Sequence, residues 1–195
     1  LENLDSEIFD NIVAVLGCDK SEIHDVYPLK QGLTNLSCHF STNDGEWVYR
    51  HPGVGTELLI DRAAEKTALE TARTLGLDNT FVFENPRRGW KISKFIPDCK
   101  NLDPKNDAQL QKAMTMARQL HESDATVERR FSFYDEGKGY EQSLLARGPI
   151  DVTDWTDMEA QATELHKLLE SEGSELVLCH NDFFSLNFLV EDNGN

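Results

Sequence analysis

One polar segment, residues 180–187 with the sequence HNDFFSLN, limits the choice of fold more than any other part of the chain. It places His180, Asp182 and Asn187 in the spacing H-x-D-x-x-x-x-N. Short apolar runs, LVLC before the segment and FLV after it, are typical of two strands on either side of a loop. The pattern therefore predicts a strand, a polar loop and a second strand.

Asp182 and Asn187 are residue types that phosphoryl transfer from ATP requires. Such a transfer needs a carboxylate that orients the attacking hydroxyl and accepts its proton, and ligands for the metal ion beside the phosphates. The side-chain oxygen of an Asn suits Mg²⁺, a hard cation that prefers oxygen. We therefore predict Asp182 as the catalytic base and Asn187 as a catalytic residue and metal ligand. His180 is expected to hydrogen-bond the backbone and fix the shape of the loop.

The overall charge and the apolar runs narrow the class of partner. The 195 residues carry a net charge of −16, which argues against nucleic acid because its phosphates require a basic face. An acidic protein suits a small cationic substrate. No apolar run approaches the ~20 residues that span a bilayer, so we expect no membrane insertion. Cysteines without a C-x-x-C pair favour reduced thiols and a cytoplasmic location; they are Cys18, Cys38, Cys99 and Cys179.

The first half of the chain predicts strands together with two helices. Apolar residues at helical spacing over 6–16 indicate a helix that ends at Gly17. An alanine-rich stretch at 60–75 predicts the second helix. The sequence Asn-Asp-Gly at 43–45 is a strong hairpin signal. Strands are expected at 25–30, 36–42, 45–50, 80–84 and 90–96, and a second hairpin joins the last two.

The second half changes to helices. Apolar side chains recur at helical spacing over 105–122 and again over 154–171. The polar segment between them predicts only a short helix near 140–146. The resulting fold class is α+β with two lobes, as in a protein kinase. A β-rich N-terminal lobe is expected over 1–97, and a mainly helical C-terminal lobe with the catalytic loop over 98–195.

A short glycine-containing segment is a candidate for binding phosphate. Gly32, Thr34 and Asn35 lie between the first two predicted strands. A glycine beside small polar side chains lets backbone N–H groups approach phosphate oxygens. An ordinary hairpin turn uses the same residue types, but the loop at 180–187 favours the phosphate role.

Arg50 and Glu65 are candidates for the cation and the carboxylate that many kinases place beside the nucleotide. Arg50 ends the third predicted strand, where kinases have a cation that grips the α- and β-phosphates. A solvated surface Arg is the alternative. Glu65 can pair with Arg50 and hold it in register, or it can form an i, i+3 pair with Arg62 on the helix surface.

Together these residues resemble the aminoglycoside phosphotransferase and choline kinase superfamily, and within it the bacterial Lic-type choline kinases. The resemblance covers nearly the whole chain in the expected order, which is more specific than any single motif. The matching pieces lie at 29–35, 47–50, 52–53, 62–65, 92–96, 120–121 and 179–187.

The resemblance implies a kinase-like fold that binds ATP and Mg²⁺, with Asp182 as the catalytic base and Arg50 at the phosphate-gripping position. The glycine-containing segment would lie over the phosphates. The backbone of the predicted inter-lobe hinge would contact adenine. The residues that bind the nucleotide would then be Gly32, Thr34, Asn35, Arg50, Glu65, Lys94, Phe95 and Ile96.

The expected function is ATP-dependent phosphorylation of the hydroxyl of choline, which gives phosphocholine. Ethanolamine, thiamine or an aminoglycoside are alternative acceptors, and a nucleotide-binding pseudokinase is an alternative of another class. The family's second metal-binding Asp and much of its aromatic choline pocket are not among these residues. A turn-like composition at 191–195 also begins a hairpin without its return strand. We therefore expect an incomplete C-terminal lobe and no activity from these residues alone. The sequence is compatible with a homodimer and does not decide the oligomeric state.

Overall fold

A computed structural model shows a mixed α+β chain made of two compact units. The first contains residues 1–127 and 178–195, and the second contains residues 128–177. The lobe boundary expected near residue 97 lies inside the first unit and stays a prediction. The structure describes residues 2–29, 36–53, 60–173 and 175–191.

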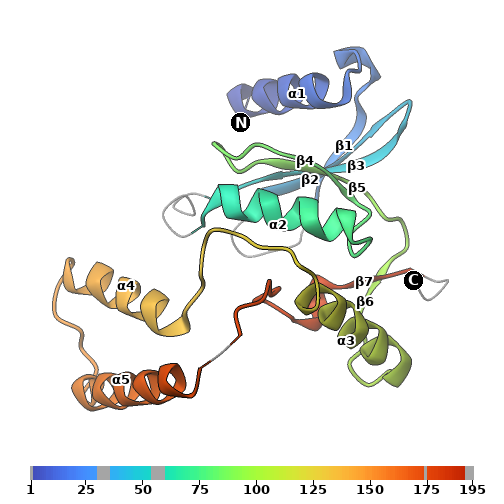
Figure 1. Ribbon diagram of the computed structural model, residues 1–195. Coiled ribbons are helices and arrows are strands. Elements are labelled where there is room, and N and C mark those ends of the chain that lie inside the picture. The colour runs from blue at the N-terminus through green and yellow to red at the C-terminus, as the bar shows by residue number, and fades with distance from the viewer. Residues whose placement is uncertain (1, 30–35, 54–59, 174, 192–195) are drawn as a thin grey trace. The chain divides into compact units, whose positions relative to one another are not determined.

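The elements confirm most of the predicted helices and strands (Figure 1). The first unit contains α1 (Glu2–Leu16), η1 (Lys20–Glu22), β1 (His24–Leu29), β2 (Leu36–Thr42), β3 (Gly45–His51), α2 (Arg62–Thr74), β4 (Phe81–Glu84), β5 (Lys91–Lys94), β6 (Lys100–Asn101), α3 (Asp107–His121), η3 (Ser185–Asn187) and β7 (Leu189–Val190). The second contains α4 (Phe133–Leu145) and α5 (Trp155–Glu172).

Five of the strands form one antiparallel sheet in the order β1-β2-β3-β5-β4. The predicted turn between β2 and β3 is confirmed, because Thr42 lies opposite Gly45 and the chain reverses over residues 43 and 44. Gly45 has a φ of 144°, a backbone conformation that side chains rarely adopt. A turn composition that permits this φ therefore fixes the register of the hairpin.

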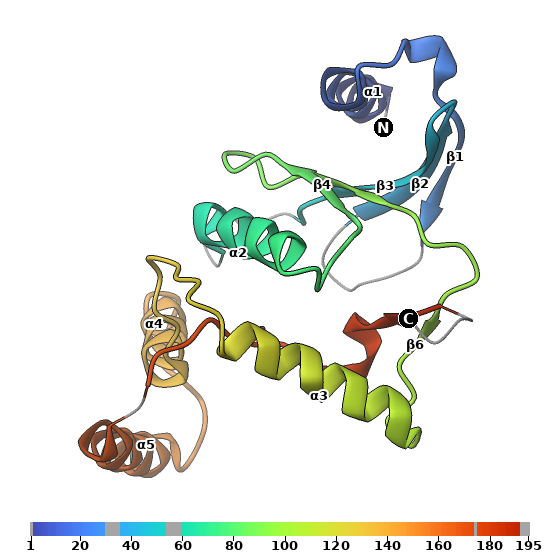
Figure 2. The same ribbon diagram turned by 45° about the vertical axis from the view of Figure 1, so that its right-hand side comes forward.

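The two faces of this sheet carry different helices (Figure 1 and Figure 2). On one face Tyr49 and Ile92 lie opposite each other on β3 and β5, and both are buried. Ile12 of α1 belongs to the same buried cluster, so α1 closes the core on this side. Facing pairs in an antiparallel sheet project to the same side, and their burial contributes the main apolar stabilisation.

The other face is more polar. Arg50 of β3, Lys91 of β5 and Glu84 of β4 occupy one cross-strand row, so their side chains share this face. Helix α2 lies on this side and has no buried residue among those described. Asp61 begins the helix by accepting hydrogen bonds from the first free backbone N–H groups. Polar contacts therefore carry much of the attachment of α2 to the sheet.

Helix α4 is longer than the short helix predicted near 140–146. Two glycines, Gly137 and Gly139, lower its intrinsic helix propensity. Ser132 compensates by capping the N-terminus, where it accepts a hydrogen bond from the Asp135 N–H at 3.2 Å. Tyr134 then stacks on His166 of α5 with ring centroids 4.2 Å apart. Contacts with α5, which no local pattern reveals, explain the extra length.

The strand predicted before the polar loop is wrong. Residues 176–179 have no strand structure, whereas the run after the loop forms β7. The partner of β7 is the short strand β6, in which Lys100 lies opposite Val190 and Asn101 opposite Leu189. An apolar run becomes a strand only where another strand supplies hydrogen bonds, and β6 pairs with the second run. The hairpin expected to begin at 191–195 lies almost wholly outside the described residues.

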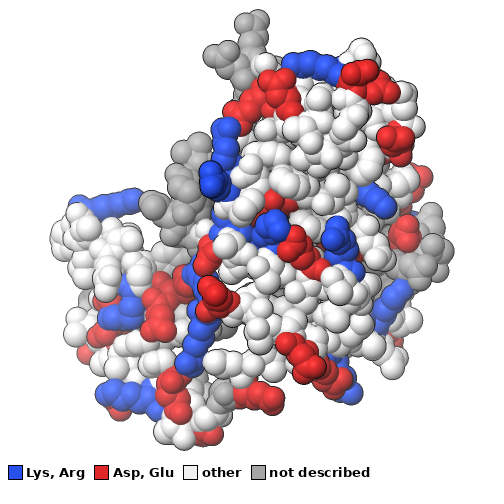
Figure 3. All heavy atoms as spheres, turned by 45° about the horizontal axis from the view of Figure 1, so that its top comes forward, with Lys and Arg blue, Asp and Glu red and all other residues white. Residues whose placement is uncertain are grey.

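The surface is mixed in charge. On the face that Figure 3 draws, Lys and Arg side chains are interspersed with Asp and Glu. Such a surface differs from the basic face that nucleic acid requires. Within the described part of the chain, no helix is long and apolar enough to cross a membrane.

Gly89 in the turn between β4 and β5 generates a test of how this turn positions α2. Its φ is +70°, and an added Cβ would lie 2.5 Å from the Nε of Arg62. Gly89→Ala must therefore strain the backbone and displace Arg62, which we expect to cost about 1–3 kcal/mol in the free energy of unfolding. Thermal denaturation measures it.

Gly137→Ala is the matched control. Gly137 lies inside α4, and an added Cβ would meet no atom within 4 Å. The change is expected to stabilise the protein by about 0.5–1 kcal/mol, because Ala is the better helix former. Equal melting temperatures for the Gly89→Ala and wild-type proteins would contradict the role given to this turn.

Candidate active site

A hydrogen bond between two predicted catalytic residues organises the loop at 180–187. The side-chain Nδ2 of Asn187 donates to Oδ2 of Asp182 at 2.7 Å and to the backbone oxygen of Asp182 at 3.0 Å. The Asn amide is thus oriented by its nitrogen, which leaves its oxygen as an acceptor for another group. The carboxylate accepts this bond at Oδ2, and its Oδ1 accepts no hydrogen bond from the residues that the structure describes. Both side chains are exposed.

The backbone around Asp182 is held in a tight turn. The N–H of Asp182 donates to Nδ1 of His180 at 3.3 Å, which confirms the role predicted for this His. Asn181 has a φ of 60°, in the left-handed region that Asn tolerates better than most residues. The N–H of Phe184 then donates to the Asp182 carbonyl at 2.9 Å. Local hydrogen bonds therefore present the Asp182 carboxylate at the surface.

Asn101 of β6 supports the second half of the loop. Its Nδ2 donates to the carbonyl oxygen of Leu186 at 2.9 Å and to that of Phe188 at 3.4 Å. Phe188 also packs edge-on against Phe183, with ring centroids 4.8 Å apart. Sequence reasoning missed Asn101, which lies 85 or more positions before its partners. No local pattern marks such a contact.

The donor atoms of the loop fit a hard metal ion at one position. Asn187 offers a neutral side-chain oxygen, which suits Mg²⁺. Asp182, bonded to the same Asn, adds negative charge nearby. Among the residues that the structure describes, no three His, Cys, Asp or Glu side chains gather as a metal site. Asn187 therefore stays the one predicted metal ligand.

The structure does not bring Arg50 and Glu65 together. Arg50 is exposed at the end of β3, and within the described chain no hydrogen bond or ion pair joins it to Glu65. Glu65 instead accepts from Arg62 at 2.7 Å and from Lys91 at 2.9 Å. The i, i+3 pair that the sequence left open is thus formed. Lys91, which sequence reasoning missed, takes the place expected for Arg50.

A second carboxyl, Glu84, lies against this ion pair. Its side chain is fully buried, and neither of its oxygens meets an N–H donor among the described residues. Burial, and then the charge of Glu65, raise the pKa of Glu84 to about 8. Burial also acts to raise the pKa of Glu65, but the charge and hydrogen bonds of Lys91 and Arg62 outweigh it and hold this pKa well below its ordinary value. Glu84 is therefore the neutral acid of the pair, and its O–H can donate a hydrogen bond to Glu65.

The predicted hinge continues the sheet. The N–H of Lys94 donates to the Thr80 carbonyl at 2.8 Å, and the N–H of Phe95 donates to the Glu46 carbonyl at 2.9 Å. The N–H of Ile96 has no hydrogen-bond partner in the described parts of the chain. Of these three backbone donors, the one at Ile96 is thus left for a ligand.

His39, which sequence reasoning also missed, packs against the hinge. The imidazole is buried, and its ring lies edge-on to Phe95 with centroids 4.7 Å apart. Its other face stacks on Tyr27 at 4.4 Å. Nε2 of the ring lies 3.1 Å from a carboxylate oxygen of Glu46, on the strand that bonds the Phe95 N–H. These contacts fix the orientation of Phe95.

Two other features complete the account of the predicted site. Gly32, Thr34 and Asn35 lie outside the described residues, so their phosphate role stays a prediction.

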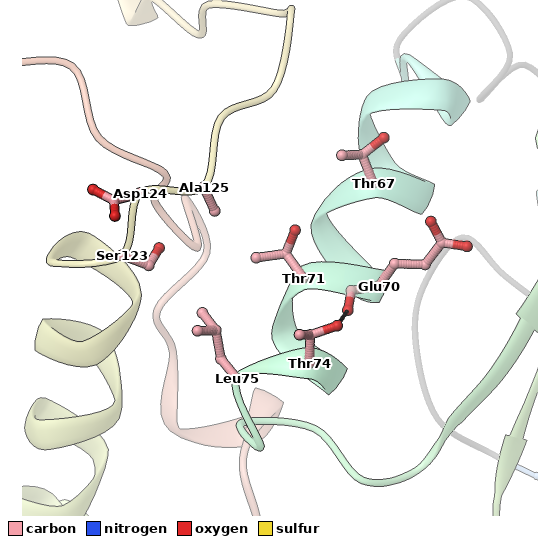
Figure 4. Close-up of a pocket in the computed structure, with 8 residues that line it drawn as sticks. All are labelled: Thr67, Glu70, Thr71, Thr74, Leu75, Ser123, Asp124 and Ala125. Carbon is pink, nitrogen blue, oxygen red and sulfur yellow. Dashed lines mark hydrogen bonds between the residues drawn. The ribbon is translucent and has the colours of Figure 1, made fainter.

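A hollow of about 340 Å³ lies elsewhere, where α2 faces the turn after α3 (Figure 4). It contains none of the predicted site residues. Its walls are formed by Thr67, Glu70, Thr71, Thr74 and Leu75 on one side and by Ser123, Asp124 and Ala125 on the other.

Comparison with known protein families shows which family contains this site. Residues 25–195 match the model of the phosphotransferase enzyme family. The chain belongs to this family. The matched range includes the five-stranded sheet and the loop with Asp182 and Asn187, so the phosphotransferase match covers both parts of the predicted site.

Solved structures resemble this chain over nearly its whole length. A crystal structure of LicA in complex with AMP is 26% identical, has a TM-score of 0.81, and matches 97% of this chain and 65% of its own. Choline kinase LicA from Streptococcus pneumoniae matches 98% of this chain and 66% of its own, at 25% identity and a TM-score of 0.81. A choline/ethanolamine kinase family protein from Mesorhizobium loti, at 24% identity and a TM-score of 0.68, matches 93% and 60%.

These likenesses establish the α+β kinase-like fold predicted from the sequence. The chain spans about 65% of the length of the LicA structure that it matches. Among curated protein sequences, none matches this chain.

The buried acid Glu84 generates a prediction of how stability depends on pH. An ordinary Glu titrates at 4.5, whereas the pKa of Glu84 is raised to about 8. Between these values the folded protein retains a proton that the unfolded chain releases, so the free energy of unfolding must fall as pH rises from about 4.5 to 8. Glu84→Gln imitates the neutral acid. It should flatten the plot of melting temperature against pH over this range and raise the melting temperature above pH 8.

The control is Glu172→Gln, which removes an exposed carboxylate at the end of α5. It should leave the shape of the pH profile as in the wild-type protein. A Glu84→Gln profile that is parallel to the wild-type profile would show that Glu84 is ionised in the folded protein.

Proposed function

We propose that the protein transfers the γ-phosphoryl group of ATP to the hydroxyl of choline. The observation that carries this proposal is the hydrogen bond between Asn187 and Asp182 in an exposed loop of a phosphotransferase-family chain. A carboxylate fixed at one oxygen and free at the other suits a base that meets an alcohol. The likeness to choline kinase LicA supports choline as that alcohol.

The chemical step assigns one role to each group. The free oxygen of Asp182 accepts a hydrogen bond from the acceptor hydroxyl, orients it and takes its proton as the new O–P bond forms. Asn187 keeps the carboxylate in place through Nδ2. Mg²⁺, when bound, neutralises phosphate charge, and Asn187 Oδ1 would be one of its ligands.

Nucleotide binding is proposed to use residues of the sheet and of the predicted hinge. Arg50 is an exposed cation at the end of β3, and a guanidinium can bind phosphate through two parallel hydrogen bonds. The free N–H of Ile96 is placed at the hinge where the adenine edge is proposed to bind. The AMP complex of LicA and the ADP complex of a spectinomycin phosphotransferase, which shares the fold, support a nucleotide as ligand.

The acceptor is the finer part of the proposal. A quaternary ammonium cannot donate hydrogen bonds, so proteins recognise it by aromatic faces and nearby carboxylates. The net charge of −16 favours a cationic acceptor over a neutral one. Ethanolamine is the nearest competitor, since it shares the hydroxyl and the positive charge and lacks only the methyl groups. An ethanolamine kinase from Plasmodium vivax shares the fold.

Replacement of Asp182 tests the catalytic assignment. Asp182→Asn keeps the size of the side chain and removes the base, so kcat should fall by about 10²–10⁴-fold. The Kd for ATP should change little, because this carboxylate faces the acceptor. Steady-state kinetics of the folded full-length protein measure kcat, and calorimetric titration with MgATP measures the Kd. Asp151→Asn, an exposed carboxylate in the second unit, is the control. A variant that keeps about a third of wild-type kcat or more would reject Asp182 as the base.

A comparison of acceptors tests the substrate. An aromatic site that encloses the methyl groups should favour choline over ethanolamine by about 10–200-fold in kcat/KM. The measurement uses the full-length protein with choline, ethanolamine, thiamine and kanamycin at saturating MgATP. If kanamycin or thiamine gives the highest kcat/KM, choline is the wrong acceptor. If no acceptor is phosphorylated while ATP still binds, the protein is a nucleotide-binding pseudokinase.

A further inference from the structure

Each oxygen of the Glu65 carboxylate contacts a cation, and neither of these cations is Arg50. Lys91 contacts one oxygen at 2.9 Å and Arg62 contacts the other at 2.7 Å. The side chains of Lys91 and Arg62 are only 16% and 13% exposed, and that of Glu65 is 25% exposed. Solvent screens such a group of charges far less than it screens surface pairs. The three charges therefore form one tightly held cluster, defined here as the α2 cluster.

Glu84 adds no charge to the α2 cluster. Its carboxyl group is buried and contacts Glu65, where two adjacent carboxylates would repel each other. As the neutral acid, Glu84 keeps its proton, and its O–H can donate a hydrogen bond to the Glu65 carboxylate. The α2 cluster then holds two positive charges against one negative charge. It has no carboxylate left to pair with a further cation.

Arg50 is the neighbour that this arrangement leaves out. It lies directly opposite Lys91 in the pairing of β3 with β5, so both side chains project from the same face of the sheet. Neighbouring like charges repel, and Arg50 is exposed. It forms no ion pair with any carboxylate in the described chain. Its guanidinium is therefore available to an anion.

We propose that Lys91 is a positioning residue which, by holding Glu65, keeps Arg50 free to bind the phosphates of ATP. This inference rests on the proposed function, because it takes ATP as the ligand of Arg50. The pairing expected from the family pattern is the opposite one, in which Glu65 holds Arg50 and orders it for the nucleotide. The two arrangements predict opposite effects of Glu65 when Lys91 is lost.

In our arrangement, loss of the Lys91 charge releases one oxygen of Glu65. Arg50 lies opposite Lys91 on the neighbouring strand, so its guanidinium would be drawn to the released oxygen. Lys91→Met keeps the length of the side chain and removes its charge, so it should weaken MgATP binding by about tenfold. Adding Glu65→Gln removes the competing carboxylate. The double variant should then regain most of the affinity that Lys91→Met alone loses.

The experiment is a titration of full-length protein with MgATP by calorimetry, for the wild type, Lys91→Met, Lys91→Arg, Glu65→Gln and Lys91→Met with Glu65→Gln. Lys91→Arg preserves the ion pair and should bind as the wild type does. Lys66→Met is the matched control, since Lys66 also pairs with a carboxylate of α2, that of Glu70. Circular dichroism and melting temperature verify that each variant is folded. A purely structural role for Lys91 would lower the melting temperature without this pattern in Kd.

The outcomes separate this inference from the proposed function. Wild-type protein that does not bind MgATP overturns the proposed function and the inference together. Binding by the wild type, with Lys91→Met equally tight, overturns the inference alone. The same holds if Glu65→Gln fails to restore binding to Lys91→Met. Recovery in the double variant, with Lys91→Arg intact, supports it. If Lys91→Met does not fold, binding by Lys91→Arg weakened about tenfold also overturns it.

Discussion

The ion pairs of Glu65 are the interaction on which the polar side of the sheet depends. Helix α2 has no fully buried residue among those described, so its ion pairs add to what its half-buried apolar side chains contribute. Lys91 links Glu65 to β5, and Arg62 lies against Gly89 in the turn between β4 and β5. A helix attached partly through charges is sensitive to the charges beside it. The neutral state of the buried acid at β4 is therefore part of the fold, because a second carboxylate there would oppose the pairing.

The loop at 180–187 depends on the same kind of constraint. Asp182 is exposed and has no packing to orient it, so its direction comes from hydrogen bonds with Asn187 and His180. Asn101 of β6 in turn bonds the backbone of the loop. Two polar networks, one on the sheet and one in the loop, thus place the proposed phosphate-binding cation and the proposed base. The core on the α1 face of the sheet is apolar and does not depend on either polar network.

The sequence allowed prediction of the features that local chemistry determines. The Asn-Asp-Gly turn, the helix end at Gly17 and the Asp182–Asn187 spacing each depend on residues close together in the chain. The features that it could not predict depend on distant partners. Lys91 lies 26 positions from Glu65, and β6 pairs with a strand almost ninety positions later. The positions of Arg50 at a strand end and Glu65 on the next helix suggested that the two pair, and only the contact of Lys91 with Glu65 at 2.9 Å reveals the actual partner.

³¹P NMR of the full-length protein with ATP, Mg²⁺ and choline tests the proposed phosphoryl transfer most directly. If the protein transfers phosphate to choline, the γ-phosphate signal of ATP decreases while the phosphomonoester signal of phosphocholine increases by an equal amount. Proof of transfer would then rest on the product rather than on ATP consumption alone. ATP that stays unchanged with every small alcohol supplied, or inorganic phosphate as the only product, would contradict the account.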